Sequence, residues 1–129
     1  MKTIKIGELE LKDIFCSDYC LGIGFEVETI PDTLLETVQK SIEEEKRECG
    51  WMLANRERKW SDKPVVIDFH TLSVSLSPKK PTEYSLLTTF HDAEDEDLEA
   101  TGTVDLDLSE YDGYIKQFIS DWLFTKFLK

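Results

Sequence analysis

Cationic side chains are outnumbered by acidic ones in this sequence. Its 129 residues contain 15 Lys and Arg against 27 Asp and Glu, which gives a formal net charge of −12. Proteins that bind nucleic acid or an anionic membrane surface depend on Lys and Arg for much of their affinity. The charge balance therefore argues against direct binding to nucleic acid and against binding to membranes.

Long apolar runs and paired cysteines are also missing. No stretch approaches the roughly 20 apolar residues that cross a bilayer, and the charged N-terminus lacks the apolar segment of a secretory signal. The three cysteines, Cys16, Cys20 and Cys49, are an odd number without the paired spacing typical of a zinc site. We therefore expect a cytoplasmic protein with free thiols and with no disulfide, metal or other cofactor.

Apolar residues are plentiful enough for one folded domain over residues 1–129, since hydrophobic residues make up 40% of the chain. Apolar alternation predicts strands at 3–11, 21–29, 65–77, 83–91 and 101–108. The first strand is expected to contain a bulge at Gly7, and the third a kink near His70. The expected fold is of the α+β class, with an antiparallel sheet of about five strands and two helices on one face, in the order ββα(β)βββα.

Two amphipathic segments predict the helices, one over residues 33–49 and one from Ser109 onward. Thr33 and Glu36 form a capping-box pattern, and Gly50 is typical of the residue that follows a helix. Residues 51–63 are compatible with a strand, a helix or a loop.

Negative charge is concentrated in one stretch. Residues 92–112 contain ten carboxylates and no Lys or Arg, so they carry −10 of the net −12. Like charges packed together weaken a fold, whereas they attract an oppositely charged partner. We expect residues 92–100 to form a loop that precedes the last strand. The candidate partner-binding residues are Asp92, Glu94, Asp95, Glu96, Asp97, Glu99, Asp105 and Asp107.

These charges favour a non-catalytic protein that binds a basic protein through an acidic face. An inhibitor, an immunity-type protein or a phage-encoded antagonist would act in this way. The basic partner could itself be a nucleic-acid-binding protein, with the carboxylates imitating the charge of its ligand. A solvated surface that binds nothing is the alternative explanation for the charge run.

A small enzyme or a metal- or ligand-binding domain is the rival function. Asp68 and His70 lie on the same face of their predicted strand, where a carboxylate–imidazole pair could perform acid–base chemistry. Asp105 and Asp107 could hold Mg²⁺ or Ca²⁺ together with loop oxygens. A pocket that holds His70 beside a carboxylate would favour this alternative.

A self-assembling structural subunit is the third function class. Phe124, Phe127 and Leu128 lie outside the apolar stripe of the last helix, which is centred on residues 114–119. A helix that is apolar all round needs a second surface to cover it. We therefore expect a homodimer that forms through the C-terminal helix, with a fold-back of the same chain as the alternative cover.

Overall fold

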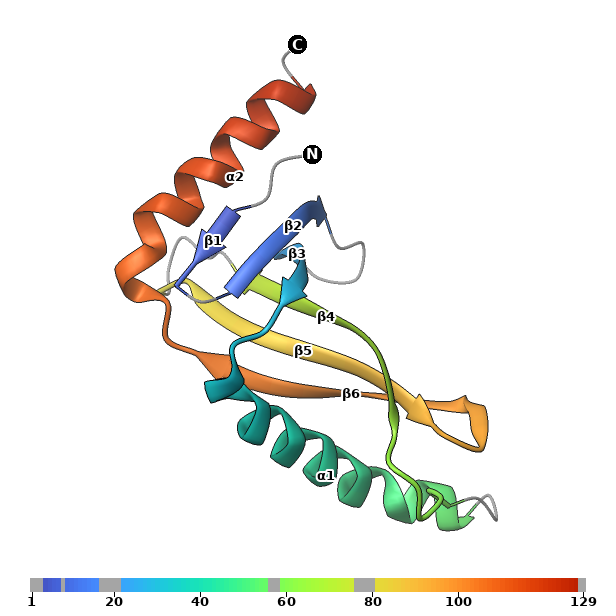
Figure 1. Cartoon of the computed structure of the whole chain (residues 1–129). Coiled ribbons are helices and arrows are strands. Elements are labelled where there is room, and N and C mark those ends of the chain that lie inside the picture. The colour runs from blue at the N-terminus through green and yellow to red at the C-terminus, as the bar shows by residue number, and fades with distance from the viewer. Residues whose placement is uncertain (1–3, 8, 17–21, 56–58, 76–80, 128–129) are drawn as a thin grey trace.

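The computed structural model describes residues 4–7, 9–16, 22–55, 59–75 and 81–127, which form one antiparallel sheet and two long helices (Figure 1). The strands are β1 (Ile4–Ile6), β2 (Leu9–Cys16), β3 (Gly22–Thr29), β4 (Val66–Ser75), β5 (Glu83–Asp92) and β6 (Asp95–Leu106). Their order in the sheet equals their order in the chain. Helix α1 (Asp32–Asn55) connects β3 to β4, and the short η1 (Ser109–Tyr111) leads into α2 (Asp112–Phe127). The α+β class is confirmed, with six strands.

The additional strand arises at Gly7, where a bulge was expected. Gly7 has a φ of 63° and lies in a tight turn, and β1 folds back on β2 with Ile4 opposite Leu11 and Ile6 opposite Leu9. Hairpin turns of this kind require positive φ, which glycine adopts without steric cost. The single strand predicted over residues 3–11 is therefore a hairpin.

Helix α1 begins at Asp32, one residue before the predicted start, and continues to Asn55, six residues past the predicted end. Gly50 lies inside the helix, and a Cβ placed there would meet nothing within 4 Å. Glycine costs about 1 kcal/mol in a helix but does not end one by itself. Met52, Leu53 and Ala54, which follow Gly50, are strong helix formers. The expectation that Gly50 ends the helix was wrong.

The stretch 92–100 is not a loop. Ala93 and Glu94 form the turn between β5 and β6, and Asp95 already belongs to β6. Along β6, the buried or half-buried residues Leu98, Ala100 and Gly102 alternate with exposed ones. The carboxylates therefore occupy a strand whose other face packs against the core.

Both helices pack on the same face of the sheet. One row across this face consists of Phe25, Leu72, Leu86 and Val104, on neighbouring strands. Val38 and Ile42 of α1 and Ile115 and Ile119 of α2 belong to the same buried cluster. The rings of Phe25 and Phe118 lie 5.9 Å apart, which ties α2 to β3.

The opposite face of the sheet, called the open face below, carries no described helix. Its central row consists of Glu26, Thr71, Leu87 and Thr103, each the chain neighbour of a residue in the buried row. Because strand side chains alternate between faces, every second residue in the regularly paired parts of β3 to β6 lies on this open face. The open face is therefore the broadest surface of the sheet that a partner could reach.

Candidate protein-binding surface

Exposed carboxylates from distant parts of the chain lie on the same open face of the sheet. Glu26 comes from β3 and Glu83 from β5, while Glu99 and Asp105 come from β6. The register places Asp105 of β6 opposite Ser85 of β5, and Ser85 opposite Ser73 of β4. Serine hydroxyl groups therefore lie beside Asp105 on the open face. Glu26 and Glu83 were missing from the candidates derived from the sequence. Both lie in strands where exposed residues alternate with more buried ones, and this alternation in the sequence could have identified them as residues of an exposed face.

Lysines on the open face lie on β1 and β2. Alternation with buried Ile6, Leu9 and Leu11 directs Lys5, Glu10 and Lys12 to this face. Lys5 Nζ lies 3.6 Å from Glu10 Oε1. Since β1 and β6 are opposite edges of the sheet, the charge of the open face becomes more negative toward β6.

Asp92 is not a surface residue, which corrects its place among the candidates. Its side chain is 2% exposed and accepts hydrogen bonds from the backbone N–H groups of Ser61, at 2.8 Å, and Glu94, at 3.0 Å. Burial alone would raise the pKa of Asp92, but these N–H donors lower it below its ordinary value. Asp92 therefore stabilises the β5–β6 turn and holds the connection after α1 against β5.

The other hairpin carboxylates remain near the surface. Glu94 Oε1 forms an ion pair with Lys63 Nζ at 3.2 Å, and Asp95 Oδ1 accepts the backbone N–H of Asp97 at 3.1 Å. Glu96, Asp97 and Glu99 are exposed. This end of β6 therefore presents several carboxylates to solvent.

Asp105 and Asp107 lie at the far end of β6. Asp105 accepts the Ser85 hydroxyl at 3.2 Å, and Asp107 Oδ1 accepts both the backbone N–H and the hydroxyl of Ser109, at 3.1 and 2.7 Å. The two hydrogen bonds from Ser109 lower the pKa of Asp107. Six regularly paired residues at about 3.3 Å each place Glu99 and Asp105 about 20 Å apart. The acidic stretch is therefore divided between the two ends of β6.

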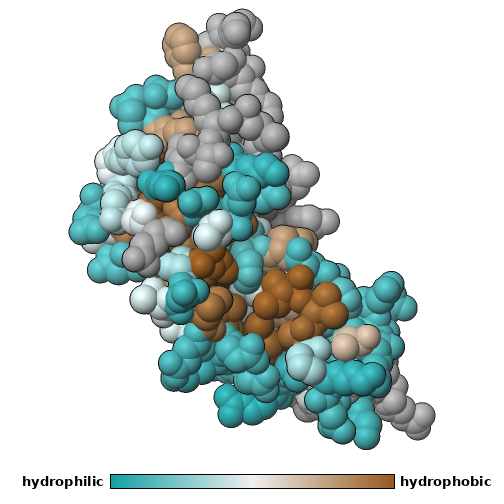
Figure 2. Space-filling model, viewed as in Figure 1, coloured by the Kyte–Doolittle hydropathy of each residue, from teal (hydrophilic) through white to brown (hydrophobic). Residues whose placement is uncertain are grey.

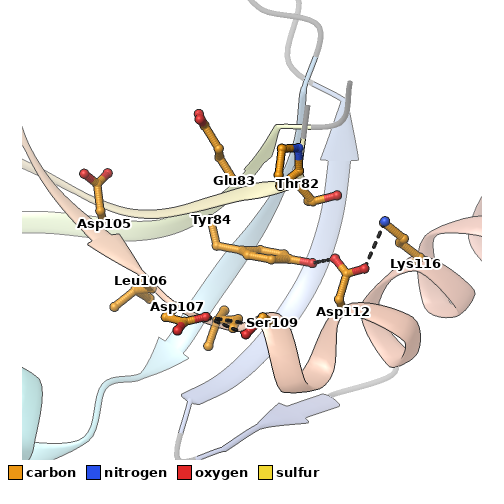
Figure 3. Close-up of a pocket in the computed structure, with 11 residues that line it drawn as sticks. Thr82, Glu83, Tyr84, Asp105, Leu106, Asp107, Ser109, Asp112 and Lys116 are labelled. Atoms are coloured by element: carbon orange, nitrogen blue, oxygen red, sulfur yellow. Dashed lines mark hydrogen bonds and ion pairs between the residues drawn. The ribbon is translucent and has the colours of Figure 1, made fainter. Parts of the chain in front are cut away.

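An open cavity of about 590 Å³ lies at that far end, between the start of β5, the end of β6 and the start of α2 (Figure 3). Glu83, Asp105, Asp107 and Asp112 contribute four carboxylates to its lining. In Figure 3, Glu83 and Asp105 point away from Asp112, which Tyr84 approaches from the core side. The described lining residues include neither histidine nor cysteine, and Lys116 lies among the carboxylates.

Asp112 holds the base of this cavity together. The Tyr84 hydroxyl donates to Asp112 Oδ1, and Lys116 Nζ lies 2.9 Å from Asp112 Oδ2. Hydrogen bonds from Tyr84 and Lys116 lower the pKa of Asp112, whereas burial and the neighbouring carboxylate raise the pKa of Tyr84. The start of α2 is thereby fixed to β5.

The predicted Asp68–His70 pair does not form. Register shifts between Ile67 and Phe69, so Asp68 is an additional residue in β4, and its carboxylate lies 2.8 Å from His91 Nδ1. His70 Nδ1 instead lies 2.9 Å from Thr88 Oγ1 on the helix side of the sheet. Burial lowers the pKa of His70, while the hydrogen bond to Asp68 raises the pKa of His91. The kink expected near His70 lies at Asp68.

Metal and thiol sites have little support in the described residues. Those residues contain no group of three or more His, Cys, Asp and Glu placed to hold a metal ion. Cys49 is a free thiol whose Sγ lies 3.4 Å from Glu45 Oε1, and burial raises its pKa. Cys20 lies outside the described residues, and of Cys16 only the backbone is described. The absence of zinc and of disulfides therefore stays a prediction.

Of the residues expected to mediate self-association, Phe124 and Phe127 belong to the far end of α2, which extends past β1 (Figure 1). The Phe124 side chain is 64% exposed. Leu128 and the side chain of Phe127 lie outside what the structure describes. The homodimer stays a prediction that rests on Phe124.

No helix in the described part of the chain is long and apolar enough to cross a membrane. Comparison with protein families, with curated proteins and with solved structures finds no match to this chain. Its function is therefore inferred from the geometry and charges given above.

Proposed function

We propose that this protein is a non-catalytic cytoplasmic protein that binds a basic surface of another protein through the open face of its sheet. The observation that carries this proposal is the presence of Glu26, Glu83, Glu99 and Asp105 on one face of the sheet, which no described helix covers. Opposed charges accelerate association and select the partner. An inhibitor, an immunity-type protein or an antagonist of a nucleic-acid-binding protein would use such a face.

The arrangement of the two histidines gives the rival enzyme function little support. His70 lies on the helix side, where it contacts Thr88, and His91 is paired with Asp68 outside the acidic cavity. The carboxylates of Asp105 and Asp107 bind different serines. Acid–base catalysis needs a base beside a substrate cavity, and neither histidine lines the one described above.

The test neutralises four carboxylates of the open face and compares the binding of this variant with that of a variant neutralised at four carboxylates of α1. The open-face variant carries Glu26→Gln, Glu83→Gln, Glu99→Gln and Asp105→Asn. Its matched control carries Gln at four exposed positions of α1: Glu36, Glu43, Glu44 and Glu48. Both variants raise the net charge by the same amount, so any difference between them reports the position of the charges.

The probe is a 20-residue oligolysine, titrated calorimetrically at ionic strengths of about 0.01 M and 0.15 M, where the screening length falls from about 30 to 8 Å. We expect the open-face variant to bind at least tenfold more weakly than the wild type, and the α1 variant to lose less than threefold. Thermal stability of the open-face variant should be equal or higher, because repulsion is relieved. Equal weakening of both variants would contradict the proposal and favour a solvated surface.

A further inference from the structure

The first half of β4 has a neighbouring strand on one side only. β5 pairs with β4 from Val66 to Ser75, whereas the pairing with β3 ends where Val27 faces His70. Beyond that point β3 leads into α1, and no described strand pairs with the other edge of residues 66–69 (Figure 1). Backbone N–H and C=O groups along such an edge are available to an added strand.

The side chains at this edge are apolar and exposed. Val66, Ile67 and Phe69 have exposed fractions of 44%, 45% and 54%. Register directs Val66 and Phe69 to the open face, opposite His91 and Thr89, whereas Ile67 lies opposite Phe90 on the helix side. Figure 2 shows an apolar patch where β4 bends across β5 and β6. Proteins usually protect an open edge with Lys, Pro or a bulge, and here the register shift at Asp68 limits regular pairing to a few residues.

Carboxylates surround this apolar edge. Glu26 and Glu28 are exposed on β3 next to the point where its pairing with β4 ends, and Asp68 lies within the edge itself. Glu99 lies two strands away from Val66, across His91. A second copy of the chain would bring the same carboxylates and a net charge of −12 to the contact, so like-charge repulsion opposes that occupant.

We propose that an extended segment of a basic protein adds to the edge of β4 at residues 66–69. The segment alternates apolar residues, which cover Ile67 on the helix side, with Lys or Arg on the open face. The aliphatic stems of those basic residues lie against Val66 and Phe69, and their charged ends approach Glu26 and Glu28. This proposal rests on the proposed function, because it takes the same basic partner and specifies how it is held.

The first arm of the test separates strand addition from simple attraction between charges. The probe is a nine-residue peptide that alternates valine and lysine. Its control is the same peptide methylated on four central backbone nitrogens, which keeps the charge but prevents pairing along either edge. Titration into ¹⁵N-labelled protein should shift the amides of residues 66–70, with at least tenfold tighter binding of the unmethylated peptide. Equal affinity of the two peptides, shifts confined to other strands, or no binding at 5 mM would overturn the proposal.

The second arm changes the edge itself. Ile67→Lys removes the apolar contact and adds a repelling charge, whereas Leu35→Lys makes a comparable change in α1, at a position that is 52% exposed against 45% for Ile67. We expect Ile67→Lys to weaken the alternating peptide at least tenfold and Leu35→Lys less than threefold. Thermal melts verify folding, and Ile67→Thr, which keeps a β-branched side chain, replaces Ile67→Lys if the latter unfolds. Equal losses in the two variants would refute the assignment of the edge.

The outcomes for the two proposals can be distinguished. If oligolysine binding depends on the open-face carboxylates while methylation of the alternating peptide has no effect, the proposed function stands and strand addition fails. If methylation weakens binding of the alternating peptide while oligolysine binding does not depend on the open-face carboxylates, strand addition stands and the proposed function fails. If light scattering shows a dimer, and Ile67→Lys dissociates it, the edge binds a second copy of the chain. That result would overturn the proposal of a basic segment.

Discussion

At Gly102, β6 approaches α1 closely. A Cβ added to Gly102 would lie 2.8 Å from Ser41 Oγ and 3.2 Å from the carbonyl carbon and oxygen of Ser41. The Ser41 hydroxyl donates to the Val38 carbonyl oxygen at 2.7 Å, so it is not free to turn aside. The helix must therefore move away from the sheet in a Gly102→Ala variant, and the packing around Val38 and Ile42 moves with it.

The magnitude follows from two opposing effects. Overpacking of a buried contact costs about 1–3 kcal/mol, while the loss of glycine's freedom in the unfolded chain returns about 0.4–1 kcal/mol. We expect Gly102→Ala to lower the free energy of unfolding by about 1–2 kcal/mol, which corresponds to a fall of about 3–8 °C in Tm for a chain of this length.

Urea and thermal denaturation followed by circular dichroism measure this change. Gly50→Ala is the matched control: a Cβ there meets nothing within 4 Å in α1, so it should raise stability by about 0.5–1 kcal/mol. In a Ser41→Ala background, the added Cβ at Gly102 no longer meets the 2.8 Å contact, although the 3.2 Å backbone contacts remain. Gly102→Ala should therefore lower the free energy of unfolding less in the Ser41→Ala background than in the wild type. A Gly102→Ala variant as stable as the Gly50→Ala variant would refute the close approach of α1 to β6.

Three further predictions concern single side chains. Tyr84→Phe removes the hydroxyl that donates to Asp112 and should cost about 1–2 kcal/mol in urea denaturation; an unchanged midpoint would show that the contact contributes nothing. Asp68 raises the pKa of His91 in the folded state, so the stability it adds is complete below the ordinary histidine pKa near 6.5 and is lost as pH rises through the raised value. An NMR titration that places the His91 pKa at or below 6.5 would contradict this, and His91→Gln should abolish that part of the pH dependence. Phe124→Ser should convert a dimer to a monomer in light scattering at high protein concentration, and a wild-type protein that is already monomeric there would remove the homodimer prediction.

The sequence by itself determined the fold class and the buried face of the most regular strands. Alternation of Phe25 and Val27 with Gly24 and Glu26 assigned each residue of β3 to its face, since a strand repeats every two residues. The concentration of carboxylates in residues 92–112 was equally plain. These features depend on neighbours a few positions apart, which local physical preferences are sufficient to specify.

The tertiary structure alone decided which side chains meet. The additional residue at Asp68 directs its carboxylate to His91, 23 positions away, and not to His70. The backbone of Ser61 approaches Asp92 and makes it a buried anchor, although its neighbours in the same acidic stretch face solvent. The open edge of β4 exists because β3 leaves it after Val27. Each of these outcomes depends on the register between segments far apart in the chain, where one residue of slip changes every contact, and no local pattern encodes that register.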